Sequence, residues 1–204
     1  MGLKEAVKDR ILILDGALGT MIQKYGLSET DFRGERFAHL PGQQRGNNDL
    51  LVLSRPEVIR EIHTRYLEAG ADIIETCTFN SQSISLADYH CESLVKEINF
   101  AAAQLARTCA DNYATPEKPR FVAGSVGPTN KTCSLSPDVN DPALRTLHFD
   151  ELAIAYQEQI EALLEGGVDA ILIETVFDTL NAKAAVVAAQ AAMSTKGREV
   201  PIML

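Results

Sequence analysis

The sequence has few cysteines, no long hydrophobic run and no cluster of basic residues. No two cysteines form a C-x-x-C pair, and no histidine lies at a metal-finger spacing from a cysteine. This argues against a structural zinc site built from Cys77, Cys91, Cys109 and Cys133. The apolar runs are broken by Asp, Glu or Gly well short of the roughly 20 residues that a membrane helix needs. A formal net charge of −9 repels a nucleic-acid backbone. We therefore expect neither a membrane nor a nucleic-acid partner.

The composition is that of an ordinary globular domain. The chain has 204 residues, of which 46% are apolar and 23% are charged. Residues 1–10 carry several charges and no apolar signal core. These features predict one soluble domain located in the cytoplasm.

Two segments, residues 68–76 and 165–175, have nearly the same pattern. Each reads as a helix end, a glycine, an aspartate, a short apolar strand, and then Glu-Thr, as Glu75-Thr76 and Glu174-Thr175. This is the pattern of a repeated β/α unit, and in parallel β/α folds the chemistry lies just past the carboxyl ends of the strands. The repeat therefore indicates both a fold and the location of a site.

Apolar runs and helical periodicity extend this alternation along the chain. The run at residues 11–14 is continuous, as expected for a strand buried on both faces. We expect strands at residues 11–14, 71–76, 120–124, 168–175 and 200–204, separated by helices at 56–69, 92–112, 150–165 and 178–196. Ser54 and Glu57 match a capping box for the first of these helices. Residues 26–48 and 131–142 are expected to be long irregular loops.

This alternation requires a parallel sheet, which can close in two ways. A doubly wound sheet usually carries a G-x-G-x-x-G turn after its first strand, and residues 16–19 lack that spacing. A (β/α)8 barrel typically needs about 250 residues. In that case the chain is part of a barrel.

Acidic residues follow several of the expected strands. A carboxylate at the end of a buried strand is costly to desolvate unless it meets a cation or hydrogen-bond donors, so Asp15, Glu75 and Glu174 indicate a polar or cationic ligand such as an amine. Asp15 could instead shape an Asp-Gly turn, and Glu75 could pair with a basic residue of a neighbouring strand.

Histidine and cysteine chemistry is not indicated. The four histidines share no motif and are expected at surface or capping positions, namely His39, His63, His90 and His148. Cys77 lies beside Glu75-Thr76, but a lone cysteine is more often a small buried apolar residue than a nucleophile.

An ordered set of motifs resembles the amino-terminal homocysteine-binding domain of cobalamin-dependent methionine synthases, within the homocysteine S-methyltransferase family. The resemblance covers essentially the whole chain and includes Leu14-Asp-Gly-Ala-Leu-Gly-Thr-Met-Ile-Gln23 and Gly70-Ala-Asp-Ile-Ile-Glu-Thr76. The remaining segments are residues 31–37, 46–53, 78–81, 127–130, 135–141 and 173–185.

The resemblance implies a methyltransferase built on a (β/α)8 TIM barrel. In this family homocysteine binds at the C-terminal face with its sulfur on zinc, and methylcobalamin, held by another domain and recharged from methyltetrahydrofolate, supplies the methyl group that gives methionine. Expected partners are therefore homocysteine and the cobalamin- and methyltetrahydrofolate-binding domains. The implied substrate contacts are Asp15, Gly16, Thr76, Ser125 and Glu174, with Asp15 and Glu174 holding the ammonium group.

The chain departs from the family's sequence pattern, and these departures limit the activity that the resemblance implies for residues 1–204. Cys77 and Ala17 stand where relatives commonly have Asn and Gly. The family's zinc ligands, a cysteine after the sixth strand and a later Cys-Cys pair, fall beyond Leu204. We therefore expect residues 1–204 to form about five of the eight β/α units. We assign no metal ligand and no catalytic residue among them. We also expect the 204-residue chain alone to be inactive.

Two alternatives remain open at this point. One is a cobalamin-independent thiol S-methyltransferase of the same barrel superfamily, which takes its methyl group from betaine or a methylsulfonium. The other is a noncatalytic amino-acid-binding module.

Overall fold

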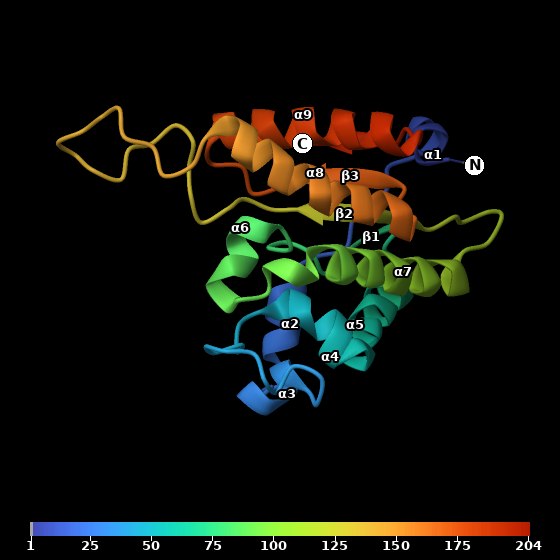
Figure 1. Cartoon of the computed structure of the whole chain (residues 1–204). Helices are drawn as coiled ribbons and strands as arrows, with labels where there is room; N and C mark the ends of the chain where they lie inside the picture. The colour runs from blue at the N-terminus through green and yellow to red at the C-terminus, as the bar shows by residue number, and fades with distance from the viewer. Residues whose placement is uncertain (1) are drawn as a thin grey trace.

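The computed structural model describes residues 2–204 and contains a single parallel sheet. Its strands are β1 (Ile73–Glu75), β2 (Phe121–Val126), β3 (Ala170–Ile173) and β4 (Ile202–Met203). They lie in the order β1-β2-β3-β4, which is also their order along the chain. A doubly wound sheet would reverse its order at a switch point, so the arrangement in Figure 1 is that of an open arc of a β/α barrel.

Four long helices connect and cover the strands: α5 (Pro56–Ala69), α7 (Val95–Tyr113), α8 (Phe149–Gly166) and α9 (Thr179–Lys196). Their positions confirm the expected helices to within a few residues. Gly70 and Gly167 end α5 and α8 in left-handed conformations, as the repeat predicts. The shorter helices are α1 (Leu3–Asp9), α2 (Leu18–Gln23), α3 (Glu29–Arg33), α4 (Leu51–Ser54) and α6 (Ser83–Leu86), with 3-10 turns at Asn48–Leu50, Ala87–Tyr89 and Glu92–Leu94.

The two faces of the sheet have different surroundings. Ile74, Val122 and Ile171 point outward into the largest apolar cluster, which they share with α7, α8 and α9. Side chains one residue away point inward and form a small cluster, closed at the amino ends of the strands by Ala6 of α1. This alternation defines an inner face, where the inward side chains of a barrel lie, and an outer face covered by helices (Figure 1).

The expected first strand is only partly formed. Leu14 makes a single parallel bridge to Ile73, and the Ile13 carbonyl accepts the Asp72 N–H at 2.7 Å. Ile11 is 85% exposed and Ile13 is 56% exposed, so the expectation of burial on both faces is wrong for these residues. The segment lies at the edge of the sheet, where a strand pairs on one side only.

The start of α5 and the loop before it also differ from expectation. Ser54 ends α4 and donates its hydroxyl hydrogen to the Leu50 carbonyl, while Arg55 occupies the N-cap position of α5 and pairs with Glu57. The predicted capping box is therefore wrong. A capping box instead forms inside the expected loop at residues 26–48, where Ser28 and Asp31 begin α3.

One histidine is not at the surface. His63 on α5 is fully buried, and neither ring nitrogen has a hydrogen-bond partner among residues 2–204. Burial lowers the pKa of His63 to about 4, because the charged imidazolium is poorly solvated there. Its position beside Ile59 and Ile62 on the buried side of α5 places it in the core.

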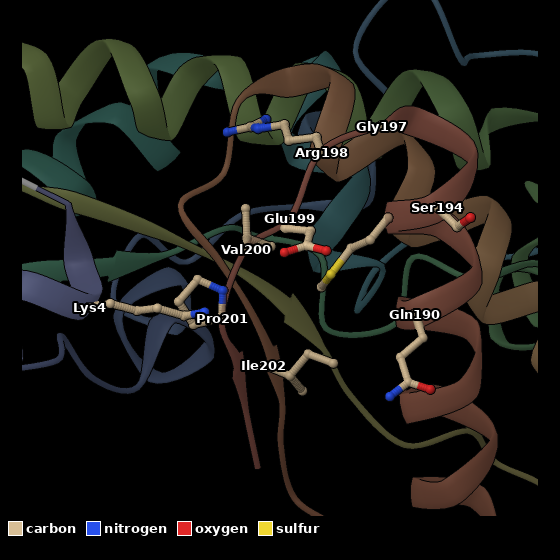
Figure 2. A pocket seen from close by; sticks show the side chains of 10 residues that line it. Lys4, Gln190, Ser194, Gly197, Arg198, Glu199, Val200, Pro201 and Ile202 are labelled. Carbon is tan, nitrogen blue, oxygen red and sulfur yellow. The ribbon is translucent and has the colours of Figure 1, made fainter.

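A wide groove lies at the β4 edge of the arc, away from the acidic strand ends. It has a volume of about 910 Å³ and runs between α9, the β4 segment and α1. Figure 2 shows Gln190 and Ser194 on one side and Lys4 on the other, with residues 198–202 between them. Within residues 2–204, no helix is both long and apolar enough to cross a membrane.

Gly166 sets the distance between α7 and α8. A Cβ built at this position would overlap the Ala103 Cβ and come within 3.0 Å of the Phe100 carbonyl oxygen. We expect Gly166→Ala to lower the free energy of unfolding by roughly 1–2 kcal/mol, since both close atoms belong to α7 and cannot rotate away. Chemical denaturation of both proteins measures this difference.

Gly19 in α2 provides the matched control. A Cβ at Gly19 would lie 3.6 Å from the Asn48 side chain, an ordinary contact. Gly19→Ala should therefore leave the stability unchanged or raise it by up to about 1 kcal/mol through helix propensity. Equal destabilisation by the two substitutions would contradict the packing explanation.

Candidate active site

Three carboxylates converge on the inner face at the carboxyl ends of the strands. Glu75 ends β1, Glu174 follows β3, and Asp15 follows Leu14, which bridges to β1. Because alternate residues share a face, Glu75 lies on the side of Ile73, and Glu174 lies on the side of Leu172. The repeat thus brings its two glutamates to one edge of the sheet.

Asp15 and Glu75 form a pair of carboxyl groups whose pKa values are both raised. Both oxygens of Asp15 accept the Glu75 N–H, each at 3.1 Å. Burial, together with the negative charges of Glu75 and Glu174, raises the pKa of Asp15 to about 8. Burial and the charge of Glu174 likewise raise the pKa of Glu75 to about 7. The pair therefore carries less than its full negative charge at neutral pH.

No basic side chain of residues 2–204 forms an ion pair with these three carboxylates. The ion pairs found within residues 2–204 involve other acids, and none includes Asp15, Glu75 or Glu174. The possibility that Glu75 pairs with a neighbouring Lys or Arg is therefore not realised in this part of the chain. A cationic ligand would lower the free energy of the ionised carboxylates.

Glu174 is held by the strand next to it. Its backbone N–H donates to the Val126 carbonyl at 3.1 Å, which extends the pairing of β2 with β3 by one residue. The Ser125 hydroxyl donates to Glu174 Oε1 at 2.5 Å. The carboxylate is therefore fixed through both its backbone and its side chain.

The other residues expected to contact the substrate are Gly16, Thr76 and Ser125. They lie near the three carboxylates but differ from them in burial and hydrogen bonding. The Thr76 and Ser125 side chains are buried, and their polar atoms already bond to protein groups. Gly16 follows Asp15 in the turn, where an added Cβ would lie 3.5 Å from the Tyr66 hydroxyl. Burial and the charges of Asp15 and Glu75 raise the pKa of Tyr66.

Sequence reasoning did not single out a further buried acid. Asp49 is 4% exposed and accepts hydrogen bonds from the Asn80 N–H at 2.7 Å and the Ser81 hydroxyl at 2.8 Å. Burial is the main cause that raises its pKa. The Cys77 Sγ lies 3.8 Å from Asp49, and burial raises the pKa of this thiol well above its usual value. Cys77 is therefore a buried small side chain, as expected.

These residues do not fit a zinc ion. Zinc sites in proteins use cysteine thiolates, histidines and carboxylates arranged tetrahedrally. Among residues 2–204, no group of three or more His, Cys, Asp or Glu side chains is arranged to hold a metal. The four cysteines are all buried and unpaired, and burial raises the pKa of each thiol.

The fold is that of a known class of methyltransferases. Three crystal structures of the homocysteine methyltransferase MmuM from Escherichia coli are similar to this chain. The metallated form is 20% identical with a TM-score of 0.72 over 98% of this chain and 65% of MmuM. The oxidized form is 21% identical with a TM-score of 0.73 over 98% and 64%, and the apo form is 23% identical with a TM-score of 0.61 over 95% and 60%.

The family assignment follows from the sequence itself. The homocysteine S-methyltransferase family model matches residues 12–204, and the chain belongs to this family. It spans about 65% of the length of the MmuM chain that it matches.

Proposed function

We propose that residues 1–204 form the part of a homocysteine S-methyltransferase that binds the amino group of homocysteine. The observation that carries the proposal is the convergence of Asp15, Glu75 and Glu174 on the inner face without a cationic partner within residues 2–204. An ammonium group can donate three hydrogen bonds to these carboxylates. It also carries the positive charge that no side chain of residues 2–204 supplies to them. Asp15 and Glu174 are its proposed acceptors.

The proposed site orients the substrate rather than transforming it. Holding the ammonium at one end of homocysteine fixes the direction of the thiol at the other end, and such orientation lowers the entropic part of an activation barrier. The proposal assigns no acid, base or nucleophile to the chain. Gly16, Thr76 and Ser125 complete the proposed substrate-binding set.

The finer proposal is a cobalamin-dependent methionine synthase of the cytoplasm that acts in methionine biosynthesis. Its methyl group would come from methylcobalamin, recharged from methyltetrahydrofolate, and its partners would be the domains that bind these two cofactors. Zinc belongs to the proposal as a cofactor of the whole enzyme. Since residues 2–204 do not fit zinc, we propose that the 204-residue chain alone does not transfer a methyl group.

A second candidate is a homocysteine methyltransferase that does not use cobalamin. MmuM, to which the chain is structurally similar, is a homocysteine methyltransferase, and this similarity fits the second candidate as well as the first. Assays of the full-length natural protein, with methylcobalamin, betaine or a methylsulfonium as the only donor, separate the candidates. Methionine formed only from methylcobalamin supports the first, and methionine formed from either of the others supports the second.

The amino-group proposal can be tested on the 204-residue chain. L-homocysteine is titrated into ¹⁵N-labelled protein, with 4-mercaptobutanoate as the matched ligand that lacks the amine. We expect homocysteine, but not 4-mercaptobutanoate, to shift the amide signals of Glu75, Ser125 and Glu174. Glu174→Gln should weaken the binding about tenfold, because it removes one charge-assisted hydrogen bond.

Glu117→Gln serves as the control, since Glu117 is exposed on the turn after α7 and lies outside the carboxylate group. It should leave the affinity unchanged. Equal shifts with both ligands would sink the amino-group proposal. The third candidate, a noncatalytic amino-acid-binding module, predicts cooperative melting that homocysteine shifts upward, and a noncooperative melt that homocysteine does not shift would remove it.

A further inference from the structure

The two Glu-Thr strand ends have different environments. Thr76 is 3% exposed, and its hydroxyl lies within a hydrogen-bonded network. Thr175 is exposed and has a positive φ of 56°. The repeat in the sequence therefore does not extend to the roles of the two threonines.

The network around Thr76 is a closed ring of three hydrogen bonds. The Ser125 N–H donates to Thr76 Oγ1 at 3.0 Å, and the Thr78 hydroxyl donates to the Ser125 carbonyl at 2.7 Å. The two threonine oxygens are 2.6 Å apart. A carbonyl can only accept, so the single Thr78 proton is used on Ser125, and Thr76 must donate to Thr78. Every proton in the ring is thereby placed.

This ring replaces strand pairing beyond the end of β1. β1 stops at Glu75, whereas β2 continues to Val126, so the backbone groups of Ser125 extend past the paired part of β1. The hydroxyls of Thr76 and Thr78 satisfy both of these groups in place of a neighbouring strand. Buried backbone groups rarely remain without partners, so the ring holds the end of β2 in place.

A helix on the outer face braces the ring. Gln159 of α8 is fully buried, and its Nε2 donates to the Thr78 carbonyl at 2.8 Å. The same nitrogen lies 3.4 Å from the Ser125 carbonyl oxygen. The ring is therefore connected to the helical layer as well as to two segments at the end of the sheet.

The only side-chain group of this assembly that reaches a site carboxylate among the described residues is the Ser125 hydroxyl. It donates to Glu174 Oε1 at 2.5 Å, from a side chain that is 2% exposed. With both backbone groups of Ser125 held, its Cα–Cβ bond has a fixed direction, and the hydroxyl reaches Glu174 from that fixed position in a single rotamer. The position of the Glu174 carboxylate then depends on residues that do not themselves touch it.

We propose that Thr76, Thr78 and Gln159 are positioning residues for Glu174 and act through Ser125. This inference rests on the proposed function, because it assumes that Glu174 receives the substrate ammonium. It gives Thr76 a supporting role in addition to its place in the proposed substrate-binding set. It also adds two residues that lie outside the expected site.

The test compares Thr78→Val, which removes the hydroxyl with little change of shape, with Thr78→Ser, which keeps it. Homocysteine is titrated into each ¹³C,¹⁵N-labelled chain, and the carboxyl ¹³C signal of Glu174 is recorded. We expect Thr78→Val to weaken binding about five- to tenfold and to move the Glu174 signal, and Thr78→Ser to restore both. Thr108→Val is the control, since Thr108 also bonds a carbonyl, that of Gln104, on the exposed side of α7.

A purely structural role predicts a different result. Thr78→Val would then lower the melting temperature while the folded protein kept its affinity and its Glu174 signal, and that outcome would overturn the inference. If Thr78→Val does not fold, Gln159→Met replaces it, with the same loss of affinity expected. Absence of homocysteine binding by the unchanged chain would reject the proposed function and the inference together, whereas unaltered binding by the variants rejects the inference alone.

Discussion

Replacing Asp72 with alanine is expected to lower the free energy of unfolding by about 3 kcal/mol. The Asp72 side chain is 2% exposed and receives two hydrogen bonds of 2.8 Å from the Arg10 guanidinium and one of 2.9 Å from the Ile13 N–H. Arg120, also buried, lies 4.0 Å away. The substitution would leave the Ile13 N–H and the Arg10 guanidinium without their acceptor and the buried Arg120 without a nearby negative charge.

Asp169, the aspartate of the second repeat, has the same role two strands further along the sheet, at the start of β3. Asp169 accepts the Val122 N–H at 2.8 Å and pairs with Arg107 at 2.6 Å. In both repeats the aspartate N–H also donates to the preceding strand, to Ile13 and Val122 respectively, at 2.7 Å. Each aspartate therefore links the start of its strand to the strand before it.

Urea denaturation of Asp72→Ala, Asp169→Ala and Asp111→Ala would test this account. Asp169 is 29% exposed, so its loss should have a smaller effect than that of Asp72. Asp111 forms an i,i+4 pair with Arg107 but is 63% exposed, and its replacement should change stability by less than about 0.5 kcal/mol. Similar effects at Asp72 and Asp111 would show that the buried links contribute little.

These links explain why the repeat predicted the fold so well. The glycine, the aspartate and the apolar run each have a local consequence: a left-handed helix end, a strand link and a buried strand. The segment at residues 11–14 has the apolar run without a preceding repeat unit. Periodicity could not reveal that it lies at the edge, because edge position depends on which strands pair rather than on local sequence.

The site could be predicted only in part for a similar reason. Asp15, Glu75 and Glu174 can be recognised in the sequence because each lies at the end of an apolar run. Thr78 and Gln159 are not, since they belong to a loop and to the middle of a helix and meet only in the folded chain. His63 was misplaced because a histidine within a helical pattern does not reveal which side of the helix is buried.

The stability of the chain is expected to fall by on the order of 2 kcal/mol between pH 6.5 and pH 9, through Asp15 and Glu75. Their folded pKa values, about 8 and about 7, lie above the ordinary values of 3.8 and 4.5. The folded state therefore binds more protons than the unfolded state, and its advantage is lost as rising pH ionises the pair. The loss is smaller than the full shifts imply, because both groups remain partly exposed to water.

His63 acts with the opposite sign on the acidic side. Its folded pKa of about 4 lies below the ordinary value of 6.5, so its contribution is lost as the pH falls from 6.5 toward 4 and is constant above that range. Urea denaturation at pH 6.5 to 8 therefore isolates the carboxylates, because the four buried thiols, whose pKa values burial raises, affect stability only as the pH approaches the ordinary thiol pKa. The double variant Asp15→Asn/Glu75→Gln should abolish the slope there, and His63→Leu should leave it unchanged.

The same measurement connects stability to the proposed ligand. An ammonium ion favours the ionised carboxylates, so its binding should lower their pKa values and release protons. Homocysteine should therefore stabilise the chain more as the pH rises from 6.5 to about 8.5, while its amine remains largely protonated, and 4-mercaptobutanoate should not. A slope that persists in the double variant would assign the pH dependence to other groups, and a stabilisation by homocysteine that is independent of pH would separate amine binding from the carboxylate pair.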